Sequence, residues 1–174
     1  LNPIAKSHAG ARGLWQFMYA TARSQGLRID SYIDERRDPI RSTEAACGFL
    51  KNLYDRYGDW YLALAAYNAG PGNVNKAIRR SGGKKNFWEI RYFLPRETRN
   101  YVPAFMAVVY LMEYHSEHNI FPSTLLSPYA ALDTVDVETT LRFDQIGAHL
   151  DIDMGRLEQL NPMYRLNIIP GPPE

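Results

Sequence analysis

The sequence contains a single cysteine, little net charge and no long apolar run. One cysteine, Cys47, excludes a disulfide within the chain. A net charge of +1 gives no general affinity for nucleic acid, so we expect none as a partner. The longest apolar stretch, residues 102–112, is too short to span a bilayer. We therefore expect membrane association only through an anchor upstream of Leu1. We expect neither a metal nor a cofactor.

Aromatic residues are plentiful, at 13% of the chain, with 12 Tyr and 3 Trp. Such side chains line sugar-binding clefts, but they also fill protein cores. The length of 174 residues is enough for one sizeable core and a small appendage. The composition therefore indicates an ordinary globular protein and leaves the ligand open.

An uncharged apolar stretch, residues 60–66, is typical of a helix that is buried on all sides. Asp59 can cap its start, and the Gly-Pro-Gly of residues 70–72 forces a turn after it. Tyr67 and Asn68 stand at the mouth of that turn, where a phenol and an amide must find partners. Those partners are either protein groups, with a buried Tyr and a capping Asn, or a bound ligand.

The first residues, 1–14, are typical of a loop in which Gly10 and Gly13 leave room for close approach of the backbone. Gln16 follows as a polar residue within an apolar run. Its amide can satisfy a loop carbonyl, or it can reach a bound sugar. A short helix is predicted over residues 19–25, because Gly26 stops it.

A longer helix is predicted over residues 39–57, because Asp38-Pro39 is a favourable start and Gly58 a favourable end. Steps of three and four predict its core face. That predicted face consists of Ile40, Thr43, Cys47, Leu50, Tyr54 and Tyr57. Cys47 is then a buried, inert thiol.

Two further helices are expected, over residues 73–80 and from residue 94 to about residue 114. Pro103 lies within the second pattern, either in the first turn or at a kink. Glu97 falls near the start of that helix, where the helix dipole favours a carboxylate without any ligand.

The composition and the pattern of apolar residues change after residue 117. Residues 118–134 carry prolines and serines and are typical of a linker. Alternation over residues 135–138 predicts a strand, and the apolar spacing beyond it predicts two short helices. Asn161-Pro162 ends the second of these helices.

Three segments resemble the signatures of the soluble lytic transglycosylase family, glycoside hydrolase family 23. They are NPIAKSHAGARGLWQFM (2–18), AAYNAGPG (65–72) and ETRNYVP (97–103). Three signatures in the right order are far more specific than one. The resemblance covers about residues 1–115 and is strongest to the membrane-bound lytic murein transglycosylase D branch. It implies a helical, lysozyme-like fold and cleavage of the glycan strands of peptidoglycan.

The tail, residues 135–174, resembles a degenerate LysM module, with a small helical appendage as the alternative. The second strand of such a module would form near Glu174. We therefore predict a mainly α protein. A lysozyme-like transglycosylase domain covers residues 1–117 and is incomplete at its N-terminus, a linker covers residues 118–134, and an incomplete α+β LysM-like segment covers residues 135–174.

The chemistry that this resemblance implies uses one carboxylic acid. The acid protonates the glycosidic oxygen between N-acetylmuramic acid and N-acetylglucosamine, which requires a raised pKa. The acetamido oxygen of the substrate stabilises the cationic carbon, and the 6-hydroxyl then closes on C1 to give a 1,6-anhydro end. The Glu of the family signature would fall before Leu1, so we expect the acid upstream of this chain.

The residues that remain are assigned by the same resemblance. Ser7 is implied to hydrogen-bond near the acetamido group, and Tyr67 is implied to hold its hydroxyl near the acid. Other matched side chains are implied to line the cleft, support its turn or contact a sugar. These substrate-binding residues are Gln16, Met18, Asn68 and Glu97.

Two alternatives to a lytic transglycosylase stay open. A lysozyme-type hydrolase on the same fold would leave reducing ends instead of anhydro ends. A peptidoglycan-binding fragment without catalysis is favoured by the absence of the family Glu from the residues given. In each case peptidoglycan glycan strands are the expected partner. The expected location is the bacterial cell envelope, either periplasmic or associated with the outer membrane.

Overall fold

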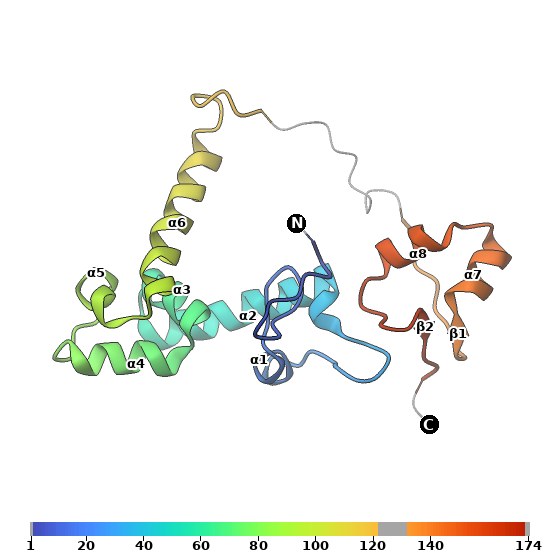
Figure 1. Cartoon of the computed structure of the whole chain (residues 1–174), viewed down its shortest axis with the longest axis horizontal. Helices are drawn as coiled ribbons and strands as arrows, with labels where there is room; N and C mark the ends of the chain where they lie inside the picture. The colour runs from blue at the N-terminus through green and yellow to red at the C-terminus, as the bar shows by residue number, and fades with distance from the viewer. Residues whose placement is uncertain (1, 122–131, 173–174) are drawn as a thin grey trace. The chain divides into compact units, whose positions relative to one another are not determined.

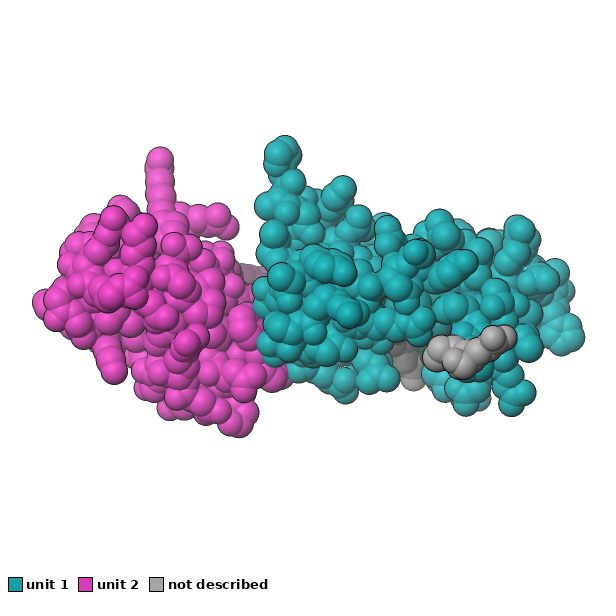
Figure 2. Space-filling view, turned by 90° about the horizontal axis from the view of Figure 1, so that it is seen from below, with its two compact units in different colours: residues 1–46, 126–174 teal, residues 47–125 magenta. Residues whose placement is uncertain are grey.

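The computed structural model of the chain describes residues 2–121 and 132–172. It divides into two compact units, one of Leu1–Ala46 with Leu126–Glu174 and one of Cys47–Leu125 (Figure 2). Helices predominate among the described residues, which confirms the mainly α prediction (Figure 1). In chain order the elements are α1 Tyr19–Ser24, η1 Glu35–Arg37, α2 Pro39–Tyr57, α3 Trp60–Ala69, α4 Pro71–Arg80, α5 Phe87–Ile90, η2 Arg91–Phe93, α6 Arg96–Glu113, β1 Leu141–Arg142, α7 Phe143–Leu150, α8 Met154–Leu160 and β2 Ile168–Ile169.

Helix α3 is the centre of the second unit and packs against α4, α5 and α6 (Figure 1). Its residues 62–66 are all buried, which confirms the predicted buried helix there, but Trp60 at its start is 54% exposed. Three of these five residues are alanines, which let the neighbouring helices approach closely. Leu62 is fully buried, and a burial of this kind contributes roughly 1.5–3 kcal/mol to stability.

A single residue determines where each end of α3 lies, Asp59 at the start and Gly70 at the end. The Asp59 carboxylate accepts a hydrogen bond of 2.8 Å from the Leu62 amide, which confirms the predicted cap. At the other end Gly70 takes a φ of +82°, a conformation that favours glycine. Helix α4 then begins directly at Pro71, earlier than the predicted start at residue 73. Proline fits the first helical position because its missing N–H would have no partner there.

Pro103 lies inside α6 and not in its first turn, so the first of its two predicted positions is wrong. A proline at this place cannot donate to the carbonyl of Arg99, one turn earlier in the helix. The guanidinium of Arg91 takes over this role, since its Nε donates to the Arg99 oxygen at 3.0 Å. The carbonyl that the proline deprives of its helical donor is therefore still hydrogen-bonded.

The predicted core face of α2 is wrong at two positions. Ile40 is 70% exposed, and Cys47 is exposed instead of being a buried thiol. The buried stripe runs through Ser42, Ala46 and Leu53, with partly buried side chains beside it. Two of these three residues are small, and the apolar spacing used for the prediction gives such residues little weight.

The first unit begins with a loop that folds back on itself. Two isolated bridges, Lys6 with Arg12 and Arg12 with Phe17, define it, and we call residues 6–17 the signature loop. Helix α1 follows and ends one residue earlier than predicted, before Gly26 with a φ of +84°. Helix η1 then leads into α2.

The tail also belongs to the first unit. Strands β1 and β2 pair antiparallel, with Leu141 opposite Ile169, and α7 and α8 lie between them in sequence (Figure 1). The strand predicted over residues 135–138 is wrong, because the described backbone there pairs with no neighbour and the first strand begins at Leu141. Of the predicted linker, residues 122–131 lie outside the described residues.

Backbone hydrogen bonds join the tail to the segment before η1. Ile33 and Tyr164 form an isolated antiparallel bridge. The Asp34 amide donates to the Met163 oxygen at 2.9 Å, and the Arg165 amide donates to the Tyr32 oxygen at 2.8 Å. These contacts use main-chain groups, so their formation depends on backbone geometry more than on side-chain identity.

Gly13 provides a test of the loop. Its φ is +81°, and a Cβ there would lie 1.7 Å from the Arg36 oxygen. We expect Gly13→Ala to lower the free energy of unfolding by about 3 kcal/mol or more, because backbone strain and a clash add. Gly10→Ala is the matched control. Its φ is +89° with open space around the Cβ, so a loss of about 1–2 kcal/mol is expected. Urea denaturation measures both, and equal losses would show that the loop does not press against Arg36.

Candidate active site

Ser7 occupies a tight turn within the signature loop. Its backbone amide donates to the Ala11 carbonyl oxygen at 2.9 Å, and its backbone carbonyl accepts from the Gly10 amide at 3.0 Å. The Ser7 hydroxyl oxygen also accepts from the Ala11 amide at 3.0 Å. This bond uses a lone pair, so the O–H can still donate to a ligand. The half-buried hydroxyl thus helps to hold the turn and keeps a donor for substrate.

Gln16 and Met18 lie at the end of the same loop. Gln16 has a positive φ of +52°, and its amide nitrogen donates to the Gly13 oxygen at 2.7 Å. The first of its two predicted roles, satisfying a loop carbonyl, is therefore confirmed. Gln16 is exposed and its amide also carries an acceptor oxygen, so contact with a sugar stays a prediction. Met18 precedes α1 and is 47% exposed, as a cleft-lining side chain would be.

A buried ion pair holds the signature loop in place. Asp34 and Arg36 are 1% and 5% exposed. Nε and Nη2 of Arg36 each donate to one carboxylate oxygen of Asp34 at 2.8 Å. Nη1 donates to the carbonyls of Phe17 and Gly10, at 3.3 and 3.4 Å. One guanidinium therefore ties two points of the loop to η1.

The charge of Asp34 is balanced from two sides. Burial by itself raises the pKa of this carboxyl, but the hydrogen bonds and charge of Arg36 outweigh it. Arg12, whose Nε lies 3.7 Å from the carboxylate, acts in the same direction. The pKa of Asp34 is therefore below its ordinary value, and the carboxylate is ionised at neutral pH. In the sequence only a mixed run of charges marks this pair, so sequence reasoning missed it.

Tyr67 lies half-buried on α3, with its ring centroid 5.6 Å from that of Phe49. Burial, and to a smaller extent the nearby phenol of Tyr101, raises the pKa of Tyr67. The phenol therefore stays protonated at neutral pH and can act as a hydrogen-bond donor. Tyr101 was not singled out as a site residue, although it lies within the third signature.

Asn68 joins two helices instead of capping its own. Its side-chain oxygen accepts a hydrogen bond of 2.7 Å from the hydroxyl of Thr98, which is 1% exposed. Thr98 follows Glu97, an exposed residue in the first turn of α6. The bond therefore brings the second and third signatures together at one end of α3 and α6. Thr98 was also missed, although it too lies in the third signature.

The six predicted side chains divide between the two compact units. Ser7, Gln16 and Met18 belong to the first unit and share the signature loop or its end. Tyr67, Asn68 and Glu97 belong to the second and share the junction of α3 with α6. Within residues 2–121 and 132–172, no three side chains gather that could hold a metal ion. The helices in those ranges also lack the length and hydropathy that a membrane crossing requires.

Comparison with known families agrees with the first two signatures, whereas the third, residues 97–103, lies beyond the matched residues. The model of the transglycosylase SLT domain matches residues 1–90. The chain belongs to the transglycosylase SLT family. The predicted resemblance is therefore confirmed, and the SLT match includes the signature loop, α3 and α4. A second family model, the LysM-like domain of lytic transglycosylase MltD, matches residues 131–174 and confirms the LysM-like prediction for the tail.

Several similar proteins are named as transglycosylases. The chain is similar to membrane-bound lytic murein transglycosylase D of Escherichia coli (strain K12), 33% identical over 165 residues, which cover 92% of this chain and 36% of the relative. Membrane-bound lytic murein transglycosylase F of Cellvibrio japonicus is 35% identical over 102 residues, 52% of this chain and 19% of the relative. Peptidoglycan transglycosylase gp16 of Escherichia phage T7 is 36% identical over 102 residues, 58% of this chain and 7% of the relative. The chain thus spans about a third of the first relative's length.

The buried pair gives a prediction about acid stability. Since the pKa of Asp34 is lower in the folded than in the unfolded chain, its stabilising effect is present above about pH 4 and is lost as pH falls through the folded pKa. Asp34→Asn leaves Arg36 buried without its counter-ion. We expect the free energy of unfolding at pH 7 to fall by about 3–5 kcal/mol. When the pH is then lowered, the variant should lose less stability than the wild type does.

The control for this variant is Asp55→Asn. Asp55 pairs with Lys51 at the surface, and such pairs contribute less than about 1 kcal/mol. Thermal unfolding followed by circular dichroism between pH 3 and pH 7 measures both variants. A similar small loss for the two would show that the Asp34–Arg36 pair does not hold the first unit together.

Proposed function

We propose that the protein cleaves the β-1,4 bond between N-acetylmuramic acid and N-acetylglucosamine in peptidoglycan and leaves 1,6-anhydromuramic acid ends. The support is the SLT family membership and the relatives named as lytic murein or peptidoglycan transglycosylases. We also propose the domain boundaries of the sequence prediction, 1–117, 118–134 and 135–174. The support for the last of these is the LysM-like match over residues 131–174, which begins within the proposed linker.

The observation that carries the proposal is the hydrogen bond between Asn68 and Thr98. It joins the second and third signatures, and α4, α5 and η2 lie between the two bonded residues in the sequence. Tyr67 precedes Asn68 and Glu97 precedes Thr98, so the bond holds a phenol donor and a carboxylate at one helix junction. A part-buried hydroxyl–amide bond of this kind fixes both chain segments, as a preorganised site requires.

The roles of the side chains follow from their chemistry. The protonated phenol of Tyr67 can donate to a carboxylate, and we propose that it orients the catalytic acid of the family, which we expect before Leu1. Ser7 keeps an O–H donor, which we propose contacts the acetamido group. We assign Gln16, Met18 and Glu97 to contacts with neighbouring sugars. Asn68 supports the turn through Thr98 and need not touch the substrate.

The products of digestion test this function. Purified peptidoglycan is incubated with the whole protein, and the released muropeptides are identified by mass spectrometry. Anhydro ends support the proposal. Reducing muramic acid ends would show a lysozyme-type hydrolase, and binding without release would show a non-catalytic peptidoglycan-binding protein. We propose peptidoglycan glycan strands as the partner. We propose the cell envelope as the location, periplasmic or outer-membrane associated, because the relatives are named membrane-bound murein enzymes.

Tyr67→Phe tests the second half of the site. The ring and its packing on Phe49 are kept, and only the hydroxyl is lost. A hydrogen bond of this kind contributes roughly 0.5–1.5 kcal/mol, so we expect turnover to fall by about twofold to tenfold with little change in melting temperature. The matched control is Tyr61→Phe on the same helix, whose ring packs against Trp88. Equal turnover of the two variants would show that Tyr67 has only a packing role.

A further inference from the structure

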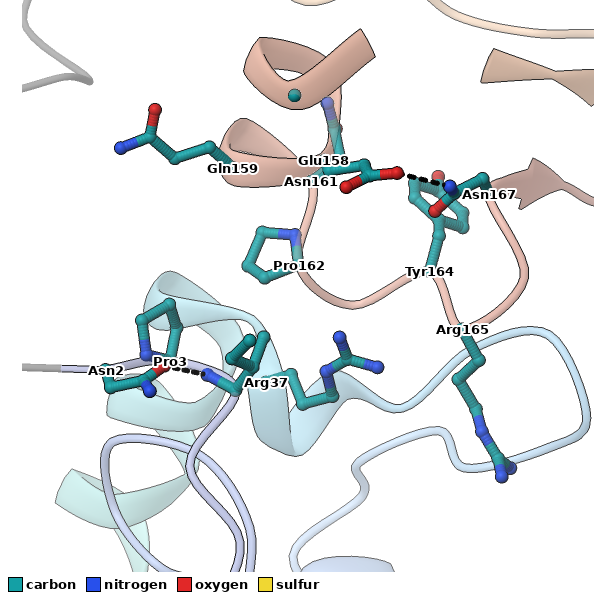
Figure 3. Close-up of a pocket in the computed structure, with 12 residues that line it drawn as sticks. Asn2, Pro3, Arg37, Glu158, Gln159, Asn161, Pro162, Tyr164, Arg165 and Asn167 are labelled. Carbon is teal, nitrogen blue, oxygen red and sulfur yellow. Dashed lines mark hydrogen bonds between the residues drawn. The ribbon is translucent and has the colours of Figure 1, made fainter. Parts of the chain in front are cut away.

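A pocket of about 440 Å³ lies within the first unit, where the N-terminal residues and the end of η1 face the tail (Figure 3). One side is formed by Asn2, Pro3 and Arg37, and the other by α8 and the turn that follows it. That turn contributes Pro162 and Tyr164, two residues from the matched LysM-like region. The pocket is therefore lined by residues from both the SLT match and the LysM-like match, and none of the six predicted site residues lines it.

Arg37 is the unusual group in this pocket. It extends from the end of η1 toward the turn at Pro162 (Figure 3). Its Nε is buried and has no hydrogen-bond partner among the residues that the structure describes. Burial lowers the pKa of Arg37, while Asp34 opposes this effect and the charges of Arg12 and Arg165 add to it. The partly buried guanidinium is thus influenced by two other cations and keeps one donor, Nε, that no described group accepts from.

The nearby carboxylates are engaged elsewhere. Asp34 binds both Nε and Nη2 of Arg36. Glu158, the acidic residue that lines the pocket, accepts a hydrogen bond from the Asn167 side chain (Figure 3). Among the charged residues that line the pocket, the two cations Arg37 and Arg165 outnumber the one anion Glu158, and the Nε of Arg37 has no acceptor among the described residues. A buried donor of this kind is costly unless an acceptor reaches it.

The chemistry of the missing acceptor is that of a carboxylate. A guanidinium edge pairs with two oxygens at once, and a charged acceptor would also offset the excess of cations. A neutral sugar can accept hydrogen bonds but does not balance charge. In peptidoglycan, the neutral amino sugars alternate with muramic acid residues whose peptide stems carry free carboxylates. The stem, and not the sugar ring, is the part that fits Arg37.

We propose that this pocket binds a carboxylate of the peptide stem of peptidoglycan, with Arg37 as its anchor. The proposal rests on the proposed function for its ligand class. It assigns the LysM-like tail a second role, in which its post-α8 turn closes a stem-binding pocket against the transglycosylase domain. A bound stem would thereby hold the substrate strand to the first unit.

The wild-type chain is tested first, by titration of the ¹⁵N-labelled protein with a disaccharide tetrapeptide of peptidoglycan. We expect amide shifts at Arg37, Tyr164 and Asn167. The same compound with amidated carboxylates, and a neutral tetramer of N-acetylglucosamine, should bind there at least about tenfold more weakly. Equal shifts for the acidic and amidated compounds would overturn the proposal. So would carboxylate-dependent shifts confined to residues 6–17 or 65–72. Displacement by an equal concentration of inorganic phosphate would show a general anion site and would also overturn it.

Substitutions then test the anchor. Arg37→Gln should weaken binding of the acidic compound by about tenfold to a hundredfold, the effect of losing hydrogen bonds to a charged group. Arg37→Lys keeps the positive charge but cannot form the two parallel hydrogen bonds of a guanidinium, so it should weaken binding less than Arg37→Gln does. Arg41→Gln, an exposed arginine on α2, is the matched control and should not change it. Unchanged affinity in Arg37→Gln would refute the assignment. If this variant does not fold, the comparison of acidic and amidated ligands with the wild type still decides.

Binding at the pocket and cleavage of peptidoglycan are measured separately. The titration records binding to this chain alone, whereas anhydro ends are sought in digests by the whole protein. If the acidic compound causes no amide shifts at Arg37, Tyr164 and Asn167 but the whole protein still releases anhydro ends, the binding site is refuted and the proposed function stands. Pocket shifts without cleavage by the whole protein would do the opposite.

Discussion

The buried pair of Asp34 and Arg36 is the interaction on which the first unit depends. One guanidinium neutralises the carboxylate and also binds two carbonyls of the signature loop. The amide of Asp34 meanwhile donates to Met163 in the tail. Taking two charges out of water is costly, and this geometry offsets the cost by satisfying the donors of Arg36 with four contacts. The loop that carries Ser7 is thus held by the Arg36 side chain, which lies outside the three family signatures.

Much of the second unit could be predicted from the sequence because local signals determine it. Asp59, the apolar run and Gly70 define α3 through capping, burial and a positive φ. The core face of α2 could not be found in this way, because small residues such as Ser42 and Ala46 are buried there. The first strand was misplaced because pairing with residues 168–169, far along the chain, and not local alternation, selects Leu141 as its start.

The candidate site shows the same division. The signatures identify Tyr67 and Asn68 as polar groups at the end of a buried helix, but not the Thr98 hydroxyl that Asn68 binds. Ser7 was assigned from resemblance, whereas its bond to the Ala11 amide depends on how the loop turns. Long-range partners of this kind have no sequence periodicity, so only the folded structure reveals them.

Amide hydrogen exchange in Arg36→Lys tests most directly whether the buried pair holds the signature loop. Lysine keeps the charge but cannot bind Asp34 and the two loop carbonyls at once. Exchange at the amides of Ala11, Arg12 and Phe17 should become at least about tenfold faster, a loss of about 1.4 kcal/mol in local stability, while residues 62–66 of α3 stay protected. Unchanged protection of the loop, or an equal loss in both units, would contradict the role given to this pair.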